Sequence, residues 1–218
     1  NKASEQNKLW AGMAKETAHQ IGTPLTSLLG WNELLKNESI DPEIPKEIEK
    51  DISRLQTITE RFSKIGSIPA LASHDIVLET KKTCDYLRKR SSKLIHFSFS
   101  SDIEALHLPL NPPLYSWSIE NLVKNGIDAM KGKGTIAIQI IKLANHILVQ
   151  VSDTGHGIPK NNFQDIFSPG FTSKKRGWGL GLSLVKRIIE EYHNGKIKVL
   201  SSNKEGTIMQ IALRIAQS

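Results

Sequence analysis

The chain has 218 residues, a formal net charge of +7, 39% hydrophobic residues and a single cysteine, Cys84. This length and composition are ordinary for globular proteins and predict one domain plus a smaller element. One cysteine excludes a disulfide framework within the chain and a cysteine-based zinc site. No apolar run is long enough to cross a bilayer, and no signal-peptide pattern is present. We therefore expect a cytoplasmic segment, whether or not a part upstream anchors the full-length protein in the inner membrane.

The positive charge belongs to the second part of the chain. Residues 1–68 carry 9 Lys and Arg against 10 Asp and Glu, whereas residues 69–218 carry 20 against 12. A basic surplus suits an anionic ligand such as a nucleotide, and a solvated basic surface explains it equally well. No basic helix or aromatic-interleaved ribbon stands out, so we expect no direct nucleic-acid partner.

Two helices are predicted in the first part. Apolar residues recur at helical spacing from Leu9 to about Leu35, and the turn-rich stretch "KNESIDPEIP" follows. A second, heptad-like pattern runs from Ile48 to Ile65. Two such helices form a helical hairpin, and one hairpin cannot bury both apolar seams. We expect residues 1–68 to form a homodimer with a second copy as a four-helix bundle.

A proline lies inside the first of these helices, close to a histidine. Pro24 cannot donate a hydrogen bond to the carbonyl of Gln20, and a proline in a helix interior costs ~3 kcal/mol. The weakened turn lies beside His19. Strain next to a titratable side chain indicates a functional site, although an ordinary exposed histidine is the alternative for His19 taken alone.

The second part, after a linker at "GSIPALASHD", combines helices with strands. The patterns predict helices at 75–91, 113–130 and 181–193 and strands at 93–100, 134–142, 146–153, 195–202 and 206–215. A mixed or antiparallel sheet with helices on one face is a two-layer α/β sandwich. The fold class is therefore multidomain, with a helical domain at 1–68 and an α+β domain at 69–218.

Two polar segments of the second domain are candidate ligand sites. Asn121 and Asn125 lie four apart on one predicted helix, so their amide oxygens share a face and suit a magnesium ion, although solvated asparagines are the simpler explanation. Asp153 ends a strand just before Gly155 and Gly157. A carboxylate there accepts a hydrogen bond from the exocyclic amine of adenine, whereas Asp and Gly also favour plain turns.

A third segment, "IFSPGFTSKKRGWGLGLSL", runs through a basic, glycine-rich loop into a helix. Gly177, Gly179 and Gly181 can present backbone N–H groups to phosphates, with Lys174, Lys175 or Arg176 adding charge. A lone GxGxG is a weak signal, because no strand precedes it here and no GxxxxGK[ST] occurs in the chain.

Five motifs in order are far more specific than any of them alone. "HQIGTPL", "NLVKNGIDAM", "DTGHGIP", "FSPGFTSK" and "GWGLGLSLVKRI" resemble the H, N, G1, F and G2 boxes of two-component sensor histidine kinases, and the resemblance covers nearly the whole chain. It implies a dimerising hairpin with a phosphoacceptor histidine and a Bergerat-type ATP-binding domain. The implied activity is autophosphorylation with ATP and Mg²⁺, followed by phosphoryl transfer to an aspartate of a response regulator receiver domain.

The resemblance also implies roles for individual residues. His19 is the phosphoacceptor, Asn125 the magnesium ligand and Asp153 the adenine contact. Phe167 and Phe171 flank a mobile lid over the nucleotide. The other implied nucleotide contacts are Asn121, Gly155, Gly157, Lys174, Gly177, Gly179 and Gly181.

The chain departs from the family pattern directly after the histidine. The family commonly has an acidic residue there, and this chain has Gln20, whose amide oxygen accepts a hydrogen bond but is not a base at neutral pH. Glu16, one helical turn earlier, is a substitute proton acceptor. Thr23 stands where the family often has Thr or Asn, which implies a role in positioning water to dephosphorylate the regulator.

Two rival classes of protein are alternatives to this hypothesis. An ATP-hydrolysing clamp of the same superfamily has a water-activating glutamate where this chain has Asn121, and Glu120 is rotated from that position by about 100° on the helix. A non-enzymatic scaffold is opposed by the presence of Asn125, Asp153 and the lid glycines. Phosphotransfer to a histidine is the preferred hypothesis.

Overall fold

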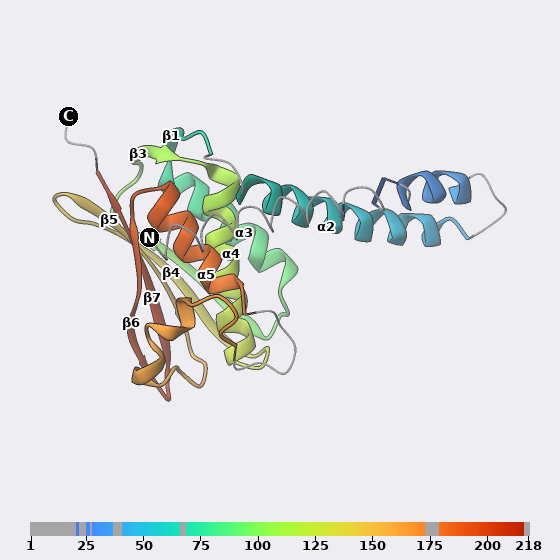
Figure 1. Ribbon diagram of the computed structural model, residues 1–218. Helices are drawn as coiled ribbons and strands as arrows, with labels where there is room; N and C mark the ends of the chain where they lie inside the picture. The colour runs from blue at the N-terminus through green and yellow to red at the C-terminus, as the bar shows by residue number, and fades with distance from the viewer. Residues whose placement is uncertain are drawn as a thin grey trace. The chain divides into compact units, whose positions relative to one another are not determined.

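The computed structural model describes residues 21, 25–26, 28–36, 41–65, 69–172 and 179–215. The chain divides into two compact units, Asn1–Pro69 and Ala70–Ser218. Figure 1 shows the secondary structure elements of both units. None of the helices in these ranges is both long enough and apolar enough to span a membrane.

The described residues of the first unit are helical at 28–36 and in α2, which runs from Glu43 to Ile65. Asp41 caps α2, because its Oδ1 accepts a hydrogen bond from the Glu43 backbone N–H at 3.0 Å. Leu25 and Ile52 are buried. Among the side chains described in this unit, six large apolar ones are exposed: Ile21, Leu28, Trp31, Leu34, Ile44 and Leu55. An apolar surface of this kind is typical of an interaction site.

A five-stranded mixed sheet is the centre of the second unit. The strand order is β2-β4-β5-β7-β6, in which β2 and β4 are parallel and the other neighbours antiparallel. The strands are β2 (Ile95–Ser101), β4 (Gly134–Lys142), β5 (His146–Asp153), β6 (Lys196–Asn203) and β7 (Gly206–Arg214). Alternate residues of β4, including Ile136, Ile138 and Ile140, are fully buried, as expected of a sheet with one covered face.

Three helices cover that face of the sheet (Figure 1). They are α3 (Ile76–Arg90), α4 (Pro112–Ala129) and α5 (Gly181–Arg187), the last of which continues as the π-helical turn η3 (Ile188–Tyr192). Two short 3₁₀ turns, η1 (Lys160–Asn162) and η2 (Asp165–Phe167), lie between β5 and α5. The core is the layer of buried side chains between helices and sheet, such as Leu122, Val149 and Val185. The mixed α/β architecture predicted for this part of the chain is confirmed.

A small second sheet was missed by the sequence analysis. β1 (Ala72–Asp75) pairs antiparallel with β3 (His107–Leu110), whereas the pattern had assigned 72–75 to the linker. That assignment was wrong because both strands have only four residues, and β3 contains Pro109. Asp75 ends β1 and caps α3, because its Oδ1 accepts hydrogen bonds from the N–H groups of Val77 and Leu106 at 3.0 and 3.1 Å.

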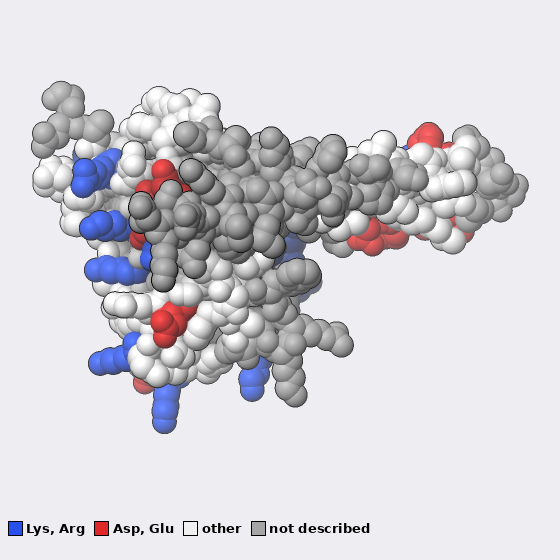
Figure 2. Space-filling model, in the orientation of Figure 1, with Lys and Arg blue, Asp and Glu red and all other residues white. Residues whose placement is uncertain are grey.

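Basic side chains gather along the sheet edge formed by β6 and its neighbour β7 (Figure 2). Lys196 and Lys198 on β6 are exposed, as is Arg214 at the end of β7. Exposed lysines on an edge strand discourage pairing with a foreign strand. Part of the basic surplus of residues 69–218 is therefore a solvated surface, which was the simpler of the two explanations for it.

Candidate functional site

The predicted site residues fall into two groups. Several of them lie outside the described residues: Glu16, His19, Gln20, Thr23, Lys174 and Gly177. Pro24 also lies outside them. The remainder are in the second unit, on α4, at the end of β5 and the turn after it, or between η2 and the start of α5: Asn121, Asn125, Asp153, Gly155, Gly157, Phe167, Phe171, Gly179 and Gly181.

Helix α4 lies directly against the end of β5 because Gly126 has no side chain. A Cβ atom on Gly126 would be 2.8 Å from the Cβ of Asp153 and 3.2 Å from its Oδ2. Asn125 is the preceding residue, so the helix that carries both asparagines is held at the Asp153 carboxylate. Gly126 was not among the predicted site residues. The available signal was a glycine in a helix interior, which costs about 1 kcal/mol relative to alanine and so indicates a close contact.

The Asp153 carboxylate is half-buried and accepts backbone hydrogen bonds. Burial raises its pKa, while hydrogen bonds from the N–H groups of Gly155 and Thr207 and the nearby His156 lower it. The bond from Gly155 to Oδ1 measures 2.8 Å. A partly desolvated carboxylate interacts more strongly with a hydrogen-bond donor than an exposed one does. Asp153 is thus a strong acceptor held in one orientation.

Thr207 on β7 is a second polar residue at this end of the sheet, and the sequence analysis missed it. It is paired in register with Asp153 and is 4% exposed. Its Oγ1 lies 2.8 Å from the Oγ of Ser202, which accepts a hydrogen bond from the Ile158 N–H at 2.7 Å. These bonds connect β6 and β7 to the turn that follows β5. No motif marked Thr207, because only the register of β5 against β7 brings it to Asp153.

The glycine turn after Asp153 is enclosed by backbone on both sides. A Cβ atom on Gly155 would lie 2.6 Å from the Cβ of Ala129 at the end of α4. Gly157 has φ +79°, and a Cβ there would lie 1.9 Å from the carbonyl oxygen of Asn203. Only glycine fits these two positions, and the turn consequently lies close against α4 and the β6–β7 hairpin.

The loop between η2 and α5 is closed at its base by glycines. The Gly170 N–H donates to the Gly179 carbonyl at 3.1 Å, and Gly179 has φ +64°. Phe167 is buried at the start of this loop, whereas Phe171 is half-buried. The two aromatic residues thus lie on the N-terminal side of the loop, where the sequence analysis expected the edge of a lid.

Asn121 meets the beginning of α5. Its Oδ1 lies 3.2 Å from the position of a Cβ on Gly181, and its Nδ2 donates to the Trp117 carbonyl at 2.9 Å. The structure therefore brings Asn121 to Gly181 and the Asn125–Gly126 turn to Asp153. Together, α4, the end of β5 and the start of α5 form one continuous candidate site for a nucleotide.

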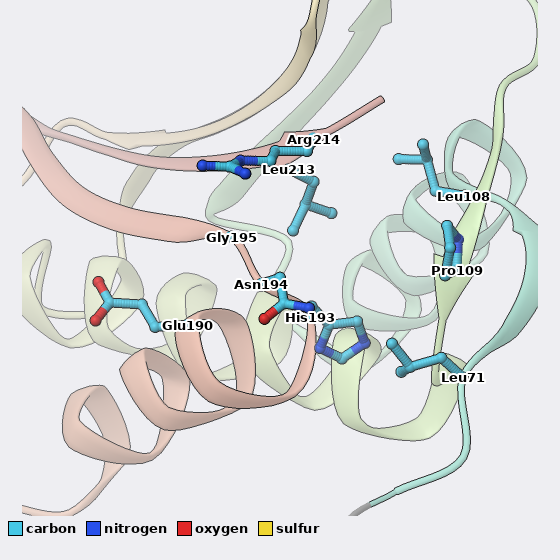
Figure 3. A pocket seen from close by; sticks show the side chains of 9 residues that line it. All are labelled: Leu71, Leu108, Pro109, Glu190, His193, Asn194, Gly195, Leu213 and Arg214. Carbon is cyan, nitrogen blue, oxygen red and sulfur yellow. The ribbon is translucent and has the colours of Figure 1, made fainter. Parts of the chain in front are cut away.

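Two cavities of about 460 and 320 Å³ lie at the other end of the sheet. Arg214, which lines both, pairs in register with His146 at the start of β5, seven residues before Asp153. Figure 3 shows the larger cavity, with apolar side chains such as Leu108 and Leu213 on its wall together with His193. Neither cavity includes a residue of the candidate nucleotide site.

Residues 116–217 match the family model described as histidine kinase-, DNA gyrase B-, and HSP90-like ATPase. The chain is similar to two proteins of Bacillus subtilis, sporulation kinase C (26% identical over 216 residues) and sporulation kinase E (28% over 215). These matches cover 96% and 94% of this chain but 50% and 29% of the relatives. The chain thus spans half or less of the length of these relatives.

Solved structures show the same similarity. The catalytic domain of histidine kinase ThkA is 28% identical, with a TM-score of 0.62 over 67% of this chain and 96% of that one. Histidine kinase ThkA in complex with response regulator protein TrrA matches 98% of this chain and 64% of that one, with 26% identity and a TM-score of 0.64. Because its motifs, its fold and these relatives agree, residues 116–217 belong to the histidine kinase-, DNA gyrase B-, and HSP90-like ATPases, and the second unit is a Bergerat-type ATP-binding domain like that of the sensor histidine kinases, to which the chain is similar.

Proposed function

We propose that the chain phosphorylates its own His19 with ATP and passes the phosphoryl group to an aspartate of a response regulator receiver domain. The observation that carries this proposal is the contact of α4 with Asp153 on one side and with the start of α5 on the other. One continuous surface then serves the adenine, the metal and the phosphates. The solved complex of ThkA with a response regulator supports the choice of partner.

In this proposal, Asp153 and the residues around it bind the adenine. The carboxylate accepts a hydrogen bond from the exocyclic amine, and Thr207 lies beside it as a further hydrogen-bonding group. Gly155 and Gly157 allow the backbone to approach the base closely. The phosphates extend toward Asn121 and the start of α5, beneath the loop that Gly170 and Gly179 close.

Magnesium fits the amide oxygen of Asn125, which is a hard ligand of the kind this ion prefers. Among the residues that the structure describes, no group of three or more His, Cys, Asp or Glu could hold a metal. A magnesium ion at this site would therefore share Asn125 with the nucleotide phosphates and water. When bound, the ion neutralises charge on the transferring phosphoryl group.

Phosphotransfer requires a neutral imidazole in line with the bond that breaks. Nε2 of His19 attacks the γ-phosphorus, the bond to the β,γ-bridging oxygen breaks, and ADP leaves. The ring proton passes to a base, for which we propose Glu16 because Gln20 is not basic, while Gln20 orients the ring. In the second step the receiver aspartate attacks the phosphorus and the P–N bond breaks. Thr23 positions water for regulator dephosphorylation.

The hydrolytic alternative is disfavoured by the environment of Glu120. This residue is 9% exposed, and its carboxylate is paired with the Lys124 ammonium at 3.0 Å. It lies next to Asn121 in sequence, so its side chain leaves the helix about 100° away. A glutamate held in an ion pair and directed elsewhere is poorly placed to activate water over the phosphates.

Incubation with γ-labelled ATP and Mg²⁺ tests the proposed function. The chain should acquire a label that is stable to alkali and labile to acid, as a phosphoramidate is. The label should then move to a receiver domain on addition of the regulator. Release of inorganic phosphate without a labelled chain would instead indicate a hydrolytic clamp, and neither product would indicate a scaffold.

Asp153→Asn should lower ATP affinity by about 10- to 100-fold, because one charge-assisted hydrogen bond is worth roughly 1.5–3 kcal/mol. The new amide also presents a donor to the adenine amine. Titration calorimetry with ATP and Mg²⁺ measures the effect. Asp85→Asn is the control, since Asp85 is a half-buried residue of α3, paired with Arg88, and is not among the candidate site residues. Equal affinities for the Asp153 variant and the unaltered chain would place the adenine elsewhere.

Leu55→Glu should convert a dimer into monomers, because a charge buried without a partner in an interface is costly. Leu55 is 42% exposed in α2, on the unit proposed to dimerise. Leu200→Glu is a matched control, because Leu200 is 41% exposed but lies on β6. Analytical ultracentrifugation distinguishes the species. A dimer that survives Leu55→Glu would exclude this helix face from the interface.

A further inference from the structure

His193 is buried at the end of η3 with both ring nitrogens engaged. It is 7% exposed, its Nδ1 lies 2.8 Å from the Ile188 carbonyl, and its Nε2 accepts a hydrogen bond from the Asn111 backbone N–H at 3.1 Å. A carbonyl can only accept, so Nδ1 carries the proton. The two partners therefore select the neutral ring with a free Nε2 lone pair. A second proton on Nε2 would face the Asn111 N–H and break that bond.

Asn111 continues the connection in two directions. Its Oδ1 caps α4 by accepting from the Leu114 N–H at 3.2 Å. Its Nδ2 donates to the Ala70 carbonyl at 3.1 Å. Ala70 is the first residue of the second unit. A row of hydrogen bonds thus runs from η3 through His193 and Asn111 to the point where the chain enters the ATP-binding unit.

The entering segment has little packing of its own. Ala70 is exposed and Leu71 half-buried, and β1 begins only at Ala72. Leu71 forms part of the wall of the 460 Å³ cavity, near His193 and across from Leu213 (Figure 3). This segment borders a cavity at Leu71, and the Asn111 side chain holds it by a hydrogen bond to the Ala70 carbonyl.

We propose that Asn111 and His193 form a latch that fixes where the chain enters the ATP-binding unit, and that the latch is closed only while His193 is neutral. The inference rests on the proposed function, because the ATP-binding unit must reach His19 of the first unit for phosphotransfer. Both are positioning residues. They lie at the opposite end of the sheet from Asp153 and do not contact the nucleotide site.

The charges around His193 are few among the described residues that line the cavity. Glu190 comes from η3 itself and Arg214 from β7, while the segment before β1 and strand β3 supply the apolar Leu71, Leu108 and Pro109. Burial lowers the pKa of His193, and its bond to the Ile188 carbonyl opposes that shift. The pKa of His193 is therefore lower in the folded chain than in the unfolded chain. As the pH falls below the ordinary value of 6.5, the unfolded chain binds a proton at this histidine before the folded chain does. The latch is fully stable above that pH and weakens as the pH falls toward the lower folded pKa.

Asn111→Asp removes the hydrogen bond to Ala70 and keeps the cap of α4. The carboxylate still accepts from the Leu114 N–H, and its charge suits a helix N-terminus, but it has no donor for the Ala70 carbonyl. We expect amide hydrogen exchange in residues 70–72 to become about tenfold faster near neutral pH, as loss of one hydrogen bond allows. The rate of His19 phosphorylation should change while ATP affinity does not. Asn145→Asp, an exposed asparagine at the same end of the sheet, is the control.

The pH dependence provides the second arm of the test. In the unaltered chain, exchange in residues 70–72, corrected for the intrinsic rate, should accelerate as the pH falls below the ordinary histidine value of 6.5. Asn111→Asp lacks the hydrogen bond to Ala70 at every pH, so its amide exchange should not accelerate further as the pH falls. Unaltered exchange in Asn111→Asp, or faster exchange with an unaltered phosphorylation rate, would overturn the latch. A failure of the proposed function is distinguishable, because the unaltered chain would then acquire no label at all.

Discussion

His19→Ala should bind ATP as tightly as the unaltered chain and incorporate no label from it. Alanine has no nucleophile, and the proposed chemistry allows no second acceptor in the hairpin. The adenine and magnesium contacts belong to the other unit, so ATP affinity should not change. Phosphorylation measured on the intact chain, in parallel with ATP binding, separates loss of the acceptor from loss of the fold.

His96→Ala is the matched control for this variant. His96 is an exposed histidine on the edge strand β2, and its removal should leave labelling unchanged. A label of the same stability on the His19→Ala chain would show that another side chain is the acceptor. In that case the roles proposed for Gln20 and Glu16 would fail with it, since both depend on their spacing from His19.

The large sheet was predictable because its strands carry a strong local signal. β4 and β5 have long apolar alternation and were predicted at the residues where they occur, Gly134–Lys142 and His146–Asp153. β1 and β3 lack that signal, since they are short and stabilised by a distant partner. The helix predicted at 181–193 is confirmed, and its last turn, Ile188–Tyr192, is π-helical.

The candidate site was only partly predictable, for a related reason. Asn121, Asn125, Asp153 and the glycines were selected because motifs in the sequence mark them. Thr207 and Gly126 were not, because their importance comes from tertiary placement: one is opposite Asp153 in the sheet, and the other is where α4 touches β5. Asn111 and His193 lie 82 residues apart, and no local pattern connects a helix cap to a distant ring nitrogen.

Gly157→Ala should destabilise the second unit by more than about 4 kcal/mol, a loss reserved for severe backbone or packing conflicts. Two costs combine at this position. A non-glycine residue in the left-handed region costs roughly 1–2 kcal/mol. In addition, the new Cβ would lie 1.9 Å from the Asn203 carbonyl oxygen and 2.7 Å from its carbon, so the turn or the β6–β7 hairpin must move.

Gly132→Ala separates these two costs. Gly132 has φ +81°, nearly that of Gly157, but no heavy atom lies within 4 Å of its Cβ position. It should lose only the roughly 1–2 kcal/mol of the backbone conformation and retain ATP affinity. Urea denaturation and ATP titration of both variants measure the difference. Since the turn carries Gly155 and follows Asp153, the Gly157 variant should also lose ATP affinity even where it remains folded. Equal losses in the two variants would mean that the turn relaxes freely away from Asn203, and that Gly157 is required for its φ angle alone.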